Sequence, residues 1–222
     1  MTFGQLVRQT FDLLFGDLAV VLIAMVAMTV VSTLADISAS PVAAFIGLPW
    51  LVVQFAMTRR LVDRQGLRVA DRRAGFGSFF LVGLLTGLGS LLGLVCLVLP
   101  GIYLAARWSM SDAVLFAENE GSGNAIGRSW AATNGHMIPI TLAMILFYSP
   151  AIVISATGFL VGFGAQQSGQ AGQALDPSVL YGVDAATNLF TTMSQVAGWY
   201  FGVAVYVLLV GRPESALEEV FA

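Results

Sequence analysis

Two charged residues within an apolar segment, Arg107 and Asp112, are the strongest candidates for chemistry in this sequence of 222 residues. Charged side chains inside a membrane span are costly, so they are paired, face a water-filled cavity or line a transport path. We expect Arg107 to pair with Asp184 or Asp36, which lie near the ends of other apolar segments. Asp112 has no evident local partner, and a protonated, a paired and a cavity-facing state all stay open for it. We interpret Arg107 as a structural clamp and keep a transport site around Arg107 and Asp112 as the alternative.

A second group of candidates is basic. Six of the ten arginines fall between residues 59 and 73, beside the ends of apolar segments. Such a cluster marks a cytoplasmic loop under the positive-inside rule. Four of these arginines recur every fourth residue, so a helix would carry a basic stripe, in which each arginine could contribute about 1 kcal/mol to binding anionic lipid headgroups. The stripe comprises Arg60, Arg64, Arg68 and Arg72.

Arg128 and Trp130 form a smaller interfacial pair. Trp130 gives its predicted helix an apolar edge, as an anchor at the membrane surface requires. Arg128 could bind a lipid phosphate or one of two nearby acidic residues, Glu118 and Glu120, and we expect the intramolecular pair.

The composition and the scarcity of reactive side chains exclude other function classes. The formal net charge is −3, which is unsuited to a general nucleic-acid-binding surface. One cysteine and one histidine are too few for a structural zinc site, and we expect no metal and no cofactor. The single histidine has no evident acidic residue to orient it, so no nucleophilic triad is apparent and we expect no enzyme.

Long apolar segments position these residues. The chain is 57% hydrophobic and 10% charged, whereas soluble domains carry about 25% charged residues. Crossing a bilayer takes about 20 apolar residues in a helix. We therefore predict an all-α polytopic membrane protein, one transmembrane domain over residues 1–222 with both termini cytoplasmic. Its six spans are expected at about 18–35, 42–58, 76–99, 102–117, 137–163 and 185–210, with interfacial helices at 1–16 and 122–134.

Small and polar residues predict how the spans pack. Pro100-Gly101 is expected to separate the third span from the fourth. Four glycines on the third span form two pairs at i, i+4 spacing, which suits close helix packing; they are Gly83, Gly87, Gly89 and Gly93. Three neutral polar residues are expected to form interhelical hydrogen bonds: Gln54, Asn188 and Gln195.

The segment 99–136 resembles the membrane domain of glycerophosphoryl diester phosphodiesterase-type proteins and the related YciC-like uncharacterised inner-membrane proteins. The shared pattern is Pro-Gly-Ile, an arginine several residues later, an acid at the helix end, then Arg-Ser-Trp and Thr-x-Gly. It is carried here by Pro100, Gly101, Ile102, Arg107, Glu118 or Glu120, Arg128, Ser129, Trp130, Thr133 and Gly135. The resemblance implies a multi-pass protein of the bacterial cytoplasmic (inner) membrane without established chemistry. The phosphodiesterase activity belongs to a separate soluble domain of those proteins and is not carried over.

The sequence thus favours a non-enzymatic integral membrane protein that interacts with lipids, or maintains or scaffolds the envelope. The expected partners are membrane lipids, and other membrane proteins or further copies of the chain. A small transporter or permease with a polar site around Asp112 and Arg107 is the alternative function.

Overall fold

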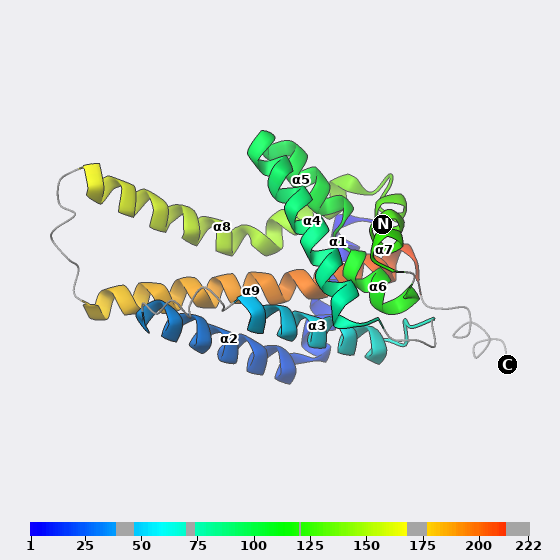
Figure 1. Ribbon diagram of the computed structural model, residues 1–222, viewed down its shortest axis with the longest axis horizontal. Helices are drawn as coiled ribbons and strands as arrows, with labels where there is room; N and C mark the ends of the chain where they lie inside the picture. Colours follow the sequence, from blue (N-terminus) through cyan, green and yellow to red (C-terminus); the bar gives the residue numbers. More distant parts are fainter. Residues whose placement is uncertain (39–46, 70–73, 120, 168–176, 212–222) are drawn as a thin grey trace. The chain divides into compact units, whose positions relative to one another are not determined.

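The computed structural model describes residues 1–38, 47–69, 74–119, 121–167 and 177–211, and this part of the chain is all-α (Figure 1). Its helices are α1 (Phe3–Gly16), α2 (Leu18–Ser38), α3 (Gly47–Arg64), α4 (Phe76–Cys96), α5 (Val98–Arg107), α6 (Ser111–Glu118), α7 (Ser122–Ala132), α8 (Met137–Gln167) and α9 (Pro177–Leu209).

Four of these helices are long and apolar enough to cross a membrane. The candidate spans are Leu18–Asp36 in α2, Phe76–Cys96 in α4, Met137–Thr157 in α8 and Gly182–Leu209 in α9. Much of α2, α4 and α8 is exposed apolar surface, which a bilayer would cover. The described residues therefore support a multi-pass membrane protein.

The other two predicted spans have a different form. The described part of α3 begins at Gly47 and carries arginines from Arg59 onward, so its apolar stretch is short; residues 42–46 of that predicted span lie outside the described residues. The predicted fourth span, at about 102–117, is not one helix, because the segment is divided into α5 and α6 by a turn at 108–110. A ten-residue helix such as α5 is about 15 Å long, half of a bilayer core.

The chain divides into two compact units. Unit 1 contains residues 1–16, 51–144 and from 199 onward, and unit 2 contains residues 17–50 and 145–198. The long helices α3, α8 and α9 each contribute residues to both units.

Unit 1 is built around α6, whose residues 113–117 are all buried. Four phenylalanines pack over this helix with ring centroids 5.4–6.1 Å apart; they are Phe55 of α3, Phe76 and Phe79 of α4, and Phe116 of α6. Buried residues of α9, including Tyr200 and Tyr206, complete the core. Burial on every side explains why this short helix carries an uninterrupted apolar run instead of an amphipathic pattern.

α4 and α5 lie side by side as a tight hairpin (Figure 1). The break falls at Leu97, which has an extended backbone, rather than at Pro100-Gly101. Pro100 occupies the first turn of α5, where the missing N–H costs no helical hydrogen bond. A Cβ at Gly93 would lie 2.9 Å from the Cα of Gly101, so glycine permits the backbones to touch. The predicted close packing is confirmed for Gly93; Gly89 faces the Trp108 ring, whereas a Cβ at Gly83 or Gly87 would meet no described atom within 4 Å.

In unit 2, α2 lies beside α9 (Figure 1), and Asn188 donates to Thr33 Oγ1 at 3.1 Å and to Asp36 Oδ2 at 2.8 Å. α8 contains Pro150, which cannot donate a backbone hydrogen bond to the carbonyl of Leu146. The Ser149 hydroxyl donates to that carbonyl instead, at 2.8 Å. This replacement lets α8 continue through the proline in an apolar environment.

Candidate functional site

Arg107 donates a hydrogen bond from each of its three guanidinium nitrogens. It ends α5, and its residue surface is 8% exposed. Nε donates to the Tyr103 hydroxyl at 2.9 Å, Nη1 to the Trp130 carbonyl at 3.0 Å, and Nη2 to Asn134 Oδ1 at 3.3 Å. The guanidinium carbon also lies 4.9 Å from the centre of the Trp130 ring and 5.2 Å from that of Tyr103, within range of a cation–π interaction.

The cluster joins the C-terminal ends of α5 and α7. Trp130, whose carbonyl accepts from Arg107, lies in the last turn of α7. In return, the carbonyl of Arg107 accepts from the hydroxyl of Ser129 at 2.8 Å, while the Thr133 hydroxyl donates to the Ser129 carbonyl at 2.8 Å. A helix C-terminus carries about half a negative charge. Two such ends at one guanidinium together offset about one positive charge, which explains how Arg107 is accommodated in the interior.

The described contacts of Arg107 differ from the predicted pairing with Asp36 or Asp184, which stays a prediction: each of its three nitrogens has a neutral oxygen partner within unit 1. The same contacts explain the break in the predicted fourth span. Because the Ser129 hydroxyl of α7 occupies the Arg107 carbonyl, the N–H of Ser111 bonds the Trp108 carbonyl instead, and the helix tightens into a turn. Gly202 of α9 leaves room for this turn, since a Cβ there would lie 2.5 Å from the Ser109 carbonyl oxygen.

Asp112 lies in the first turn of α6 and is partly buried. The amide of Gln54 donates to Asp112 Oδ2 at 3.0 Å, which confirms the interhelical bond predicted for Gln54. A helix N-terminus also favours a negative side chain. The Gln54 amide and the N-terminus of α6 therefore stabilise the Asp112 carboxylate in the interior, without a metal ion or a second charged side chain.

Three arginines of α3 line a shallow hollow, which we call the arginine surface. It has a volume of about 670 Å³ and is lined by Phe55, Ala56, Arg59, Arg60, Asp63 and Arg64. Arg59 is half-buried, and its contact within the described residues is the face of the Phe55 ring, at 5.8 Å. The carboxylate of Asp63 lies 3.3 Å from Arg68, so this acid is shared with an arginine outside the hollow.

The structure describes three of the four arginines of the predicted basic stripe. Arg60 and Arg64 line the arginine surface and Arg68 pairs with Asp63, whereas Arg72 lies outside the described residues. Sequence spacing did not single out Arg59, although its position four residues after Phe55 is the spacing at which an arginine covers an aromatic ring on a helix.

Arg128 and Trp130, predicted as an interfacial pair, make separate contacts. Arg128 Nε lies 3.4 Å from Glu118, one of its two predicted acidic partners, and Glu118 also accepts from the Tyr206 hydroxyl at 3.1 Å. Glu120 lies outside the described residues. The Trp130 ring is partly exposed but holds Arg107 and packs edge-on against Tyr103. Its contacts are those of an interhelical clamp.

Asp36 and Asp184 belong to unit 2. Asp36 accepts from Asn188, as expected of an interhelical amide. Asp184 lies on α9, partly exposed, and no hydrogen bond or ion pair joins it to another described residue.

The described residues contain no group of three or more His, Cys, Asp or Glu side chains that could hold a metal ion. Comparisons of the chain with known protein families, with curated proteins and with solved structures find no match.

Proposed function

We propose that this chain is a non-enzymatic multi-pass protein of the bacterial cytoplasmic membrane that binds anionic lipid headgroups at the arginine surface of α3. In this proposal the chain crosses the membrane six times with both termini cytoplasmic, and α5 and α6 together make the fourth crossing. Its role is to maintain or scaffold the envelope, with lipids and other membrane proteins as partners.

The observation that carries the proposal is the set of partners of Arg59. Its guanidinium lies on Phe55 in a hollow with Arg60 and Arg64, and no carboxylate among the described residues pairs with it. Arginine matches the geometry of a phosphate with two donors at once. The one acid of the hollow, Asp63, is paired with Arg68. An anionic headgroup would therefore meet an excess of positive charge here.

The proposed side of the membrane agrees with this chemistry. Arginines concentrate on cytoplasmic loops, and the cytoplasmic leaflet carries the anionic lipids. The apolar residues of α3 precede the arginine surface, so a lipid whose tails lie along the helix would bring its headgroup to the arginines.

The alternative of a transporter centred on Asp112 and Arg107 has less support. Arg107 is bonded through all three nitrogens and is buried. Asp112 already accepts from Gln54. A transported solute would have to displace both sets of bonds.

The experiment compares lipid binding by Arg59→Gln and wild-type protein. Purified full-length chain is titrated with phosphatidylglycerol, and bound lipid is counted by native mass spectrometry, with phosphatidylcholine as the neutral reference. One arginine near a lipid surface contributes about 1 kcal/mol, so Arg59→Gln should bind phosphatidylglycerol about fivefold more weakly.

Arg8→Gln is the matched control, because it removes the same charge from an arginine whose side chain is 85% exposed and pairs with Asp12 on α1. We expect it to bind phosphatidylglycerol as the wild type does. Equal weakening by the two variants, or no preference of the wild type for phosphatidylglycerol, would show that the arginine surface is not a headgroup site.

A further inference from the structure

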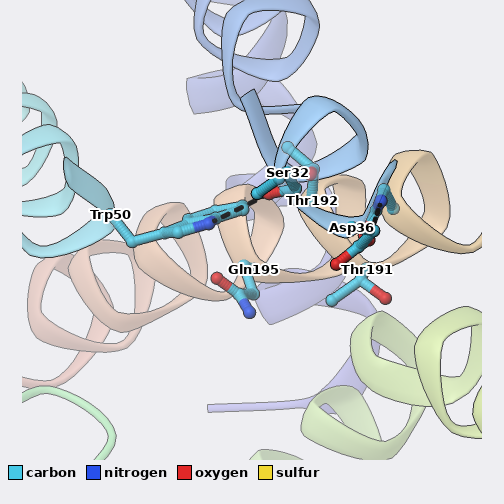
Figure 2. Close-up of a pocket in the computed structure, with 8 residues that line it drawn as sticks. Ser32, Asp36, Trp50, Thr191, Thr192 and Gln195 are labelled. Carbon is cyan, nitrogen blue, oxygen red and sulfur yellow. Dashed lines mark hydrogen bonds between the residues drawn. The ribbon is translucent and has the colours of Figure 1, made fainter. Parts of the chain in front are cut away.

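Unit 2 contains a polar hollow that the proposed function does not use. It lies between α2, the first turn of α3 and α9, and has a volume of about 230 Å³. Figure 2 shows the side chains gathered around it: Ser32 and Asp36 of α2, Trp50 of α3, and Thr191, Thr192 and Gln195 of α9. The outward faces of α2 and α9 are apolar, with exposed residues such as Leu34 and Leu189. Polar residues on membrane helices are costly and mark function.

Part of this polar lining has no protein partner. The Thr192 side chain is fully buried, and its hydroxyl makes no hydrogen bond within the described residues. Thr187 of α9 places its hydroxyl on the carbonyl four residues before, whereas the hydroxyls of Thr29 of α2 and Ser194 of α9 are, like that of Thr192, buried without a partner among the described residues. The amide of Gln195 also has no partner among the described residues. Unsatisfied polar groups of this kind are destabilising unless a ligand or water bonds them.

The charge of the hollow indicates the class of ligand. Asp36 is its one charged lining residue, and no arginine lines it. One carboxylate oxygen of Asp36 accepts from Asn188, which leaves the second oxygen available. The indole N–H of Trp50 points to Ser32 Oγ at 3.4 Å, so the polar edge of that ring is directed at α2. A carboxylate with a free oxygen suits a cation, through a charge-assisted hydrogen bond.

We propose that this hollow binds a protonated amine of headgroup size. The ammonium donates to Asp36, and the hydroxyls and the Gln195 amide bond the rest of the ligand. The volume is below the 300–1,000 Å³ typical of sites for drug-sized molecules, so the ligand is small. Such an amine is supplied by a lipid headgroup or by a free alkylamine. This inference does not depend on lipid binding at the arginine surface, which uses a different unit and the opposite charge.

The experiment uses full-length chain in nanodiscs of phosphatidylglycerol, a lipid without an amine. In one arm, ethylammonium chloride is titrated at constant ionic strength and binding is measured by equilibrium dialysis. In the second arm, phosphatidylethanolamine is added and the retained lipid is identified by native mass spectrometry. Saturable binding in either arm supports the proposal and identifies the source of the amine. Absence of saturable binding in both arms overturns it.

Variants localise the binding. Asp36→Asn keeps an oxygen for Asn188 but removes the charge, and should weaken binding at least about tenfold, since a hydrogen bond to a charged group contributes over about 1.4 kcal/mol. Asp184→Asn makes the same change on α9 outside the hollow and should leave binding unchanged. Gln195→Met tests the site without disturbing the Asp36–Asn188 bond, and decides the question if Asp36→Asn does not fold. Equal weakening by the two aspartate variants, or unchanged binding in Gln195→Met, contradicts the assignment.

Discussion

Replacing Arg107 tests the view that one buried arginine joins two helix ends. Arg107→Met retains a long apolar side chain of comparable length and removes the charge together with three hydrogen bonds. It leaves the carbonyl of Trp130 and the side chain of Asn134 without their donor. Arg107→Lys retains the charge but cannot reach three acceptors in one plane.

The expected loss follows from the contacts. A hydrogen bond to a charged group contributes about 1.5–3 kcal/mol, so three contribute about 4.5 kcal/mol at the lower end of that range. The methionine variant also avoids the desolvation of a guanidinium, a cost of several kcal/mol that offsets part of this loss. We therefore expect Arg107→Met to lower the free energy of unfolding by about 2–3 kcal/mol. Arg107→Lys should lower it by about 1–2 kcal/mol, because charge compensation at the two helix ends is retained.

The free energy of unfolding is measured by steric trapping or by reversible denaturant titration in mixed micelles, with circular dichroism as the readout. Arg8→Met serves as the control, since the Arg8 side chain is exposed. A methionine variant within about 0.5 kcal/mol of the wild type would refute the clamp, because surface substitutions produce changes of that size. A lysine variant as unstable as the methionine variant would refute compensation by the helix ends.

Two further predictions concern close packing and the buried carboxylate. Gly93→Ala should destabilise the protein by about 1–3 kcal/mol in the same unfolding assay, because its Cβ would press on the Gly101 backbone. Gly83→Ala has open space at its Cβ and should not destabilise it, so equal stability of the two variants would contradict the hairpin contact. Gln54→Met should destabilise the protein by about 1–3 kcal/mol, because it removes the hydrogen-bond donor to Asp112, and adding Asp112→Leu should restore part of that loss. A double variant less stable than Gln54→Met would show that Asp112 has another stabilising role.

The sequence predicts the long helices well because their signal is local. Runs of about twenty uncharged residues need no tertiary information to be recognised as membrane helices. The spacing of Gly89 and Gly93 likewise predicts a face for close contact, and the structure places Gly101 of α5 against Gly93 and the Trp108 ring against Gly89. The helix break predicted at Pro100-Gly101 lies instead at Leu97, because a proline in the first turn of a helix starts that helix and does not end it.

The hydrogen-bond partners of Arg107 are not acidic residues, so charge complementarity in the sequence does not predict them. Its acceptors are a backbone carbonyl, a phenol and an amide, and backbone carbonyls occur at every position of the sequence. Which carbonyl is available depends on where α7 ends in space. A partial signal was present, because Ser129 and Thr133 are four residues apart and so place two hydroxyls on one face of the predicted helix, opposite another helix end.

The hairpin of α4 and α5 has a consequence for biosynthesis. α5 has ten residues, fewer than a helix needs to enter a bilayer on its own during translation. Leu97, which joins α5 to α4, and the first two residues of α5, Val98 and Leu99, are apolar and exposed, and α4 has 21 residues and can enter alone. We therefore expect α5 to enter the membrane together with α4, as a loop led by Leu97–Leu99, with Arg107 as the last residue of α5 to be drawn in. Lengthening the connection with polar residues would strand α5 at the surface, although its own sequence would be unchanged.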